Sequence, residues 1–213
     1  MTLSTYLLYL GAVALLVLSP GPTMLMCMTC SLQHGPRKAL AAAAGSVTAV
    51  LGTMLLSALG LGALLAASET AFWALKALGA AYLIWLGVKT FRSQGSVFEQ
   101  LPKDGVAAQA TVSTRKLFAQ GLVVGGSNPK AILFFTAFFP QFLDPSAAWA
   151  PQFAVLASTF VAFEFTVLTL CAAGVARLAP VLRSGNRMRW FNRVSGGLFA
   201  LMGSLLLVTR RTA

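Results

Sequence analysis

The feature that most constrains the fold of this chain is a series of apolar segments, each close to the length needed to cross a lipid bilayer. A membrane-spanning helix needs about 20 mainly apolar residues. Such segments occur at residues 6–29, 39–67, 70–88, 117–143, 152–176 and 190–209. Charged residues make up only 10% of the chain, against about 25% in a soluble domain. The sequence therefore predicts an all-α integral membrane protein with about six transmembrane helices.

The first and last segments decide whether the number of spans is six or five. No Lys, Arg, Asp or Glu precedes Arg37, so the first segment lacks the basic flank of a cleaved signal peptide and is expected to stay as a structural helix. The last segment is charge-free only over 194–208, which is short for a span. Six spans are the simplest reading, and five follow if one of these two segments does not cross.

The distribution of basic residues predicts which ends of the helices face the cytoplasm. Three of the connections are basic, and they carry Arg37, Lys38, Lys89, Arg92, Lys103, Arg115, Lys116, Arg177, Arg183, Arg187, Arg189 and Arg193. The two intervening connections carry only Glu69 and Asp144. Since basic residues concentrate on the cytoplasmic side, the N-terminus is expected outside. Arg210 and Arg211 disagree with this scheme, because six spans put the end of the chain outside as well.

A polar stretch divides the chain into two halves. Residues 93–114 contain glycine and have a weak helical pattern, as expected of a cytoplasmic linker. This gives a first three-helix unit at 1–92 and a second at 115–213. An odd number of crossings in the first half forces the second half to enter from the opposite side. If the halves are structural repeats, they are inverted ones.

Helix-breaking residues occur at corresponding places in the two halves. The first segment contains SPGP at 19–22, and the fourth contains GGSNPK at 125–130. Proline lacks an N–H group and displaces the preceding turn, so each helix is expected to break or kink there. Backbone freed inside a membrane must be paired within the protein or line a watery cavity. Paired interruptions of this kind indicate a binding site, although such residues also occur as simple packing kinks.

Three charged residues lie inside predicted spans, where each costs at least ~2.5 kcal/mol unless paired or hydrated. They are Lys76, Lys130 and Glu164. At ~1.5 Å per residue, Lys130 and Glu164 both fall near the middle of the membrane. We expect them to approach each other, directly or through water, with Glu164 the group best able to change protonation. The alternative is a buried ion pair that only fixes helix packing. Lys76 lies nearer a helix end and is expected to reach the interface.

In this order and spacing, these motifs resemble the LysE/RhtB family of bacterial amino-acid exporters, the LysE-type translocators. The similarity covers nearly the whole chain. It rests on SPGP at 19–22, on Gly35 and Gly45, on GAAYL at 79–83 with Gly87, on NPK at 128–130 and on the glycine-rich last segment. The resemblance implies a multi-pass carrier of the bacterial cytoplasmic (inner) membrane that expels amino acids or close derivatives, driven by proton antiport.

Transferring the family's two motifs gives a predicted substrate site. The predicted substrate-binding residues are Pro20, Gly21, Pro22, Asn128, Pro129 and Lys130. Exposed helix ends at the two breaks would offer N–H groups to a carboxylate and carbonyl groups to an ammonium. Lys130 could hold the carboxylate, and Glu164 the amine or the exchanged proton. The proton-coupling role of Glu164 comes from its burial and not from the family pattern.

Residues after Gly45 narrow the expected substrate. Some family members carry an acidic residue one turn after this glycine, but residues 46–50 contain none. This difference weakens the case for a dibasic substrate and favours neutral or small hydroxylated amino acids. The partners expected from the sequence are therefore the amino acid, protons and membrane lipid. A homo-oligomer is compatible with these features.

Two further readings remain open. Cys27 and Cys30 could serve a membrane thiol-disulfide electron carrier, but the fourth segment has no cysteine and Cys171 is alone on the fifth. A divalent-cation exporter of related architecture would need several carboxylates or a His/Cys cluster, and Glu164 alone does not suffice. The sequence predicts no enzyme, no cofactor and no metal site. The net charge of +11 does not indicate nucleic-acid binding, because its basic residues are divided among short loops.

Overall fold

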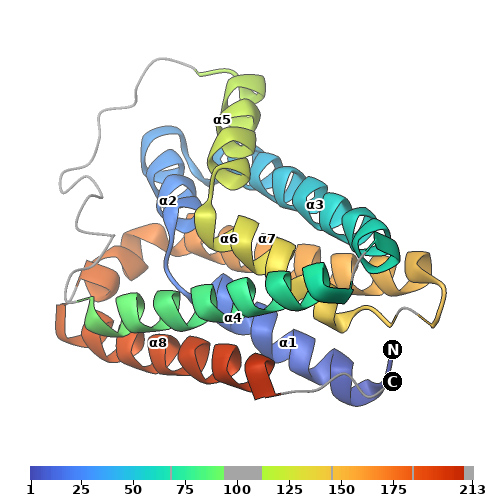
Figure 1. Cartoon of the computed structure of the whole chain (residues 1–213). Coiled ribbons are helices and arrows are strands. Elements are labelled where there is room, and N and C mark those ends of the chain that lie inside the picture. Colours follow the sequence, from blue (N-terminus) through green and yellow to red (C-terminus); the bar gives the residue numbers. More distant parts are fainter. Residues whose placement is uncertain (68, 94–111, 145, 184, 209–213) are drawn as a thin grey trace.

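The structure is a computed structural model that describes residues 1–67, 69–93, 112–144, 146–183 and 185–208. The described residues are helical and contain no strand, which confirms the predicted all-α class (Figure 1). In chain order the elements are α1 (Leu3–Leu18), α2 (Pro22–His34), α3 (Pro36–Ala67), α4 (Glu69–Arg92), α5 (Thr114–Gly126), α6 (Pro129–Leu133), η2 (Phe134–Phe138), η3 (Phe139–Phe142), α7 (Trp149–Arg183) and α8 (Gly185–Val208). Most of the predicted linker 93–114 lies outside the described residues, as do Arg210 and Arg211.

Every predicted apolar segment corresponds to one helix or to one bent pair of helices. Two helical stretches, Pro36–Gly60 and Trp149–Val175, are long and apolar enough to cross a membrane on their own. The pairs α1 with α2 and α5 with Pro129–Phe142 qualify when each is taken as one span, with bends of 49° and 53°. The described residues therefore provide up to four spans by length and composition, and α4 and α8 add two further 24-residue helices.

The helices run between two ends of the molecule. The start of α1, the junction of α3 with α4 and the connection before α7 lie at one end in Figure 1. The C-terminal ends of α4 and α7 lie at the opposite end, together with the start of α8. The latter end carries exposed basic side chains, including Lys89, Arg92 and Arg177. Residues from two of the three basic connections therefore share this end, and the orientation of the chain in the membrane stays a prediction.

Two helix pairs approach so closely that only glycine fits between them. A Cβ on Gly87 or Gly196 would lie within 3.0 Å of backbone atoms across the α4–α8 contact. Gly45 and Gly121 have the same position between α3 and α5, against backbone atoms of Phe118 and Ala42. Small residues allow such contacts in membranes, where apolar side chains gain little by leaving lipid. These two pairs are the most extensive helix–helix contacts among the described residues.

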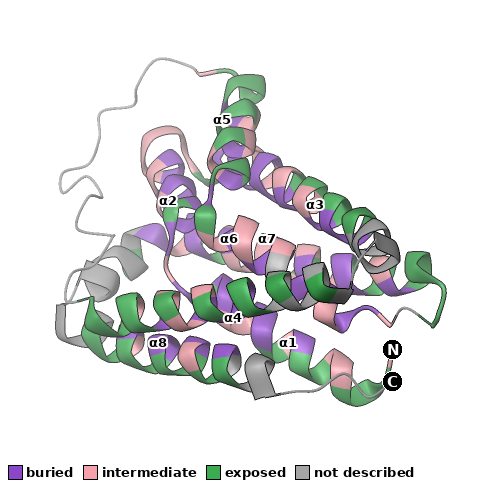
Figure 2. Cartoon of the chain, viewed as in Figure 1, coloured by how far each residue is buried: buried purple, intermediate pink, exposed green. Residues whose placement is uncertain are grey.

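Aromatic side chains fill the core between α1, η2, η3 and α7. Tyr9 lies 5.1 Å from Phe142, and Phe135 lies 4.9 Å from Phe160, between ring centroids in edge-to-face geometry. The Tyr9 hydroxyl donates to the Leu156 carbonyl at 2.9 Å. Figure 2 shows buried residues where helices face one another, and exposed residues on the outward faces. Large apolar side chains are common on these outward faces, for example Leu56 and Leu170, as expected for contact with lipid.

The second bent span changes helix type after its break. Residues Phe134–Phe138 form a π-helical turn, and Phe139–Phe142 form a 3₁₀ turn. Pro140 accounts for the interruption of the regular helix, because it has no N–H group for the carbonyl of Thr136. The Phe139 N–H donates instead to the Phe134 carbonyl, five residues back. The apolar segment 117–143 was expected to be a regular helix after its break, although Pro140 is a sequence signal against this.

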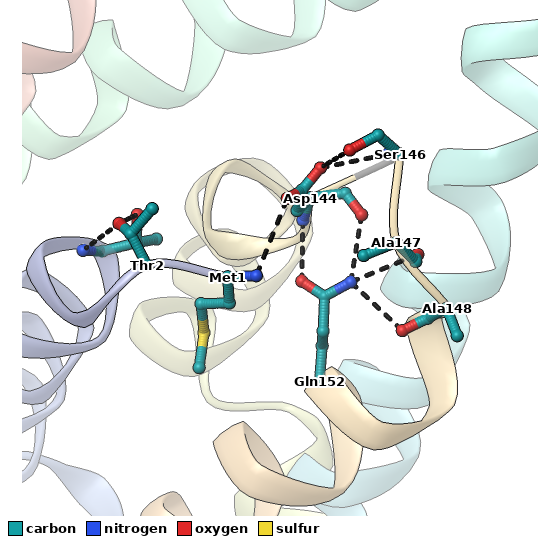
Figure 3. A network of polar contacts seen from close by, with 8 residues as sticks. Met1, Thr2, Asp144, Ser146, Ala147, Ala148 and Gln152 are labelled. Atoms are coloured by element: carbon teal, nitrogen blue, oxygen red, sulfur yellow. Dashed lines mark hydrogen bonds and ion pairs between the residues drawn. The ribbon is translucent and has the colours of Figure 1, made fainter.

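A polar network joins the start of the first half to the connection before α7 (Figure 3). The Met1 ammonium lies 3.6 Å from the Asp144 carboxylate. Asp144 also accepts hydrogen bonds from the Ser146 hydroxyl and N–H group. Gln152 is buried, accepts from the Asp144 N–H and donates to three carbonyls of this connection. This network ties both bent spans together at one end of the molecule.

Candidate functional site

The first break leaves backbone groups at the end of α1 without their usual partners. In a continuous helix, the Leu16 carbonyl would accept from the N–H of residue 20, but that residue is Pro20. Pro22 removes another donor and begins α2 as its first residue. Gly21 between them is extended, with φ −158° and ψ −178°, a conformation open to any residue. Gly21 is therefore not required here for its backbone freedom.

Lys130 supplies the donors that the first break lacks. Its ammonium donates to the Leu16 carbonyl at 2.8 Å and to the Ser19 carbonyl at 2.6 Å. The C-terminal end of a helix carries partial negative charge, so a cation is favoured there. A Cβ on Gly21 would lie 3.3 Å from the Lys130 Nζ. The missing side chain of Gly21 makes room for the lysine.

The second break is capped by its own residues. The Asn128 side-chain oxygen accepts from the Lys130 backbone N–H at 3.1 Å, and Pro129 is the first residue of α6. The Ser127 hydroxyl donates to the Val123 carbonyl at 2.7 Å. The Asn128 amide donates to the Thr23 hydroxyl at 3.2 Å, and this bond is buried. Together with Lys130, this contact joins the two breaks directly.

A small cavity lies where the two bent spans meet. Its lining comes from α1 and α2, from Val50 of α3, and from α6 and α7: Leu16, Val17, Ser19, Gly21, Thr23, Met24, Val50, Asn128, Lys130, Ala131, Phe160, Glu164 and Leu168. It has room for about one water molecule and is far smaller than an amino acid. In this conformation the cavity is too small for an amino acid, so a substrate binds there only if helices or side chains move.

Glu164 reaches this cavity from the middle of α7. Its carboxylate makes no hydrogen bond or ion pair with any described residue, although its charge interacts with that of Lys130. Phe160 and Leu168, one turn to either side, are buried and line the same cavity. The expected approach of Lys130 and Glu164 therefore takes the form of a shared cavity. The Lys130 ammonium itself binds backbone carbonyls.

The predicted site residues divide into two groups. Gly21, Asn128, Lys130 and Glu164 line the cavity. The three prolines, Pro20, Pro22 and Pro129, shape the breaks beside it.

Sequence analysis missed the carbonyls of Leu16 and Ser19 and the hydroxyl of Thr23. One signal was available, because a proline four residues after Leu16 leaves that carbonyl free.

The three cysteines do not line this cavity. Lys76 lies within α4, and its side chain is outside the description. Cys27, Cys30 and Cys171 are free, buried and packed in one apolar cluster between α2 and α7. Cys171 is thus near the other thiols, which its isolation on the fifth segment did not indicate. No group of three metal-ligating side chains occurs within the described ranges.

Two bent apolar spans whose breaks meet at a small cavity containing Lys130 and Glu164 are typical of membrane carriers. The comparison with known families agrees with this class. The family model described as LysE type translocator matches residues 14–210. The chain therefore belongs to the LysE-type translocator family, and it is a transporter-family protein rather than an enzyme.

Named relatives cover nearly the full length of this chain. It is 37% identical over 210 residues to a homoserine/homoserine lactone efflux protein of Salmonella typhimurium, with 99% of each chain covered. It is 32% identical over 201 residues to a leucine efflux protein of Klebsiella pneumoniae, covering 94% of this chain and 88% of that protein. An uncharacterized membrane protein of Vibrio cholerae is 32% identical over 210 residues, covering 99% of this chain and 100% of that protein. No solved structure matches the chain.

Proposed function

We propose that this protein exports neutral or small hydroxylated amino acids, or close derivatives, across the bacterial inner membrane in exchange for protons. The observation that carries the proposal is the pair of helix breaks joined by Lys130 and Asn128 at one cavity. Broken helices at the membrane centre are where carriers bind small charged substrates. Full-length relatives named as homoserine/homoserine lactone and leucine efflux proteins support the same substrate class.

The helix ends at the first break offer one subsite to each charged group of an amino acid. Gly21 provides no side-chain cap for α2, so the first N–H groups of this helix are available to a carboxylate. The carbonyl end of α1 already binds one ammonium, that of Lys130. The substrate-binding residues of this proposal remain Pro20, Gly21, Pro22, Asn128, Pro129 and Lys130.

The walls of the cavity favour an uncharged substrate side chain. Val17, Val50 and Leu168 are among its apolar lining residues. α3 supplies no acidic residue at 46–50, the stretch that faces α5 and the cavity. A second positive charge on a dibasic amino acid would have only Glu164 to pair with. Its transport would then compete with proton exchange at the same carboxylate.

Glu164 is proposed as the proton-coupling group. It is the only acidic side chain that lines the described cavity, and no described residue donates a hydrogen bond to it. A carboxylate without fixed partners can gain or lose a proton without breaking the fold. Protonation and deprotonation of this carboxylate as the substrate enters and leaves the cavity would couple the two fluxes.

The test is transport by inverted membrane vesicles or proteoliposomes under an imposed pH gradient. Labelled homoserine, homoserine lactone, leucine and lysine are compared in wild type, Glu164→Gln and Asp144→Asn. We expect gradient-dependent uptake of the first three by wild type and by Asp144→Asn, whose carboxylate lies outside the cavity. Glu164→Gln is expected to fold but to lose the response to the gradient.

Each result of this experiment has a definite reading. Uptake of none of the four compounds by wild type would reject the exporter assignment. Unchanged gradient dependence in Glu164→Gln would leave the exporter but return Glu164 to a packing role. Preferred uptake of lysine would reject the substrate class.

A further inference from the structure

We infer that the carbonyl end of α1 is an ammonium-binding site, and that Lys130 is its built-in occupant, which a ligand's primary ammonium group displaces. This inference rests on the proposed function for the identity of the natural ligand, but the site itself does not depend on transport. It assigns Lys130 a different role from the carboxylate binding expected from the sequence.

The ammonium site exists because of the sequence of the first break. Pro20 deprives the Leu16 carbonyl of its helical donor, and the Ser19 carbonyl lies beyond the last turn of α1. The two oxygens converge on one ammonium, at 2.8 and 2.6 Å from its nitrogen. Unpaired buried carbonyls in a membrane are costly, so this position requires a donor at all times.

The present donor, the Lys130 ammonium, comes from another element and can leave. Lys130 reaches the carbonyls from the first turn of α6, across more than 100 residues of sequence. Its backbone is held separately, by the Asn128 cap, so the side chain can move while the helix stays in place. Glu164 in the same cavity has no partner among the described residues and can receive the released ammonium.

The space for a ligand comes from Lys130 itself. The cavity holds about one water molecule, and the Lys130 side chain lines it and reaches α1. Displacing this side chain vacates the volume of its four methylene groups next to the carbonyls. A ligand ammonium therefore gains both its binding groups and its room from the same movement. Binding is an exchange of one ammonium for another, and the net charge at the carbonyls is unchanged.

The geometry defines the chemical class of ligand. Two carbonyls need a cation with at least two N–H donors, as in a primary ammonium. An amino acid or an aminolactone with a free amine fits this requirement. An N-acylated derivative has lost the charge, and a quaternary ammonium has no N–H group. Neither of these is expected to displace Lys130.

The test is rescue of a vacated site by a small amine. Lys130→Ala leaves the carbonyl pair without its donor, and propylammonium can enter the space of the lost side chain. The purified full-length protein in detergent is heated with propylammonium chloride or tetramethylammonium chloride at equal concentration. We expect Lys130→Ala to unfold several degrees below wild type, and propylammonium to recover most of this loss. Tetramethylammonium is expected to recover none.

Wild type and Lys116→Ala serve as controls, since Lys116 is exposed on α5. Lys116→Ala should respond to each salt as wild type does. In both, propylammonium should gain less over tetramethylammonium than it does in Lys130→Ala, because Lys130 already occupies the site. If propylammonium raises the unfolding midpoint of Lys130→Ala no more than that of wild type, the ammonium site is rejected.

A second variant keeps the test decisive if Lys130→Ala folds poorly. Pro20→Ala restores an N–H group at residue 20, so α1 can extend and supply the Leu16 carbonyl itself. The double variant Pro20→Ala/Lys130→Ala should be more stable than Lys130→Ala and should ignore propylammonium. A double variant no more stable than Lys130→Ala would contradict the inference.

Failure of the proposed function gives a different pattern. Amine rescue of Lys130→Ala, in a protein that transports none of the four labelled compounds, would keep the ammonium site and reject the exporter. Transport by wild type without amine rescue would keep the exporter and reject the site.

Discussion

The two helix breaks occupy corresponding places in the halves of the chain, but they solve the same backbone problem in opposite ways. The second break pairs its own backbone groups. The Ser127 hydroxyl donates to the Val123 carbonyl, and the Asn128 side chain accepts from the Lys130 N–H. The first break has no side chain that does this, and its carbonyls are held by a residue of the other half. The second break is thus self-sufficient, while the first depends on a partner that can be exchanged.

This difference separates support from binding. Asn128 fixes the second break and, through Thr23, its distance from the first. The first break then presents open helix ends to the cavity from a defined position. A repeat architecture would predict two similar breaks. Under the function and the ammonium site proposed above, the side chains around them instead make the second break a support and the first a binding site. Substitutions at three sites test this division, and a fourth tests the polar network that joins the two bent spans at one end of the molecule. They are given in decreasing order of their expected effect on stability.

Gly125→Ala is expected to have the largest effect, because the second break needs close contact with α3. A Cβ at this position would lie within 3.0 Å of Ser46, including its backbone. Overpacking against backbone atoms costs about 1–3 kcal/mol, and we expect the upper part of this range in the free energy of unfolding in detergent. Gly126→Ala is the matched control, since its Cβ would only touch Ala49 at 3.6 Å. Equal stability of the two variants would argue against the close α3–α5 contact.

Asn128→Ala is expected to follow, with a loss of about 2 kcal/mol. It removes the cap of α6, worth about 1 kcal/mol, and a buried hydrogen bond of similar worth. Thr23→Val removes only the bond between the breaks and should cost about half as much. Thermal unfolding followed by circular dichroism measures both. A larger loss in Thr23→Val than in Asn128→Ala would contradict the assignment of the second break as the support.

Gly21→Ala is expected to change stability by less than about 1 kcal/mol, because the backbone at Gly21 is extended and tolerates a side chain. The new methyl group would press on the Lys130 ammonium, 3.3 Å away. We expect transport to fall several-fold while folding is retained. Uptake at the wild-type rate would show that the fit between Gly21 and Lys130 does not matter for the carrier.

Asp144→Asn is expected to have the smallest effect, confined to neutral and mildly acidic pH. Hydrogen bonds from Ser146, with the nearby Met1 ammonium, lower the pKa of the exposed Asp144 carboxyl below its usual value. A lowered pKa in the folded state gives stability that is present above the unfolded-state pKa and is lost as pH falls through the folded value. Unfolding midpoints of wild type and variant should therefore differ at about pH 7 and approach each other as the pH is lowered below about 4, the unfolded-state pKa of Asp. A difference in unfolding midpoint that does not change with pH would contradict a stabilising role for the ionised Asp144 carboxylate.

Hydropathy and proline positions were enough to predict most of the fold. Apolar length located the helices, because a membrane permits few alternatives to them. Pro20 with Pro22, and Pro129, located both breaks, since the missing N–H is a covalent property of the residue. The π-helical turn before Pro140 and the 3₁₀ turn that contains it were not predicted. Pro140 indicates that the regular helix is interrupted, because it has no N–H group for the carbonyl of Thr136, but it does not specify which turns replace the helix.

The sequence predicted which residues lie at the candidate site better than it predicted their contacts. Gly21, Asn128, Lys130 and Glu164 were expected together and do line one cavity. The direction of the Lys130 ammonium was not predicted, because a long side chain chooses among partners that only the folded chain brings near. Cys171 shows the same limit, since its neighbours in the folded protein, Cys27 and Cys30, lie more than 140 residues earlier.

The contact of α4 with α8 has a consequence for the variation this protein can tolerate. Gly87, Gly196 and Gly203 each face backbone atoms within 3.0 Å on the opposite helix. Even alanine is too large at these positions, whereas Gly197 on the other side of α8 faces open space. In a library of random variants selected for export, we expect these three codons to stay almost unchanged and codon 197 to accept most small residues. Sequencing such a library would show which glycines the contact of α4 with α8 requires.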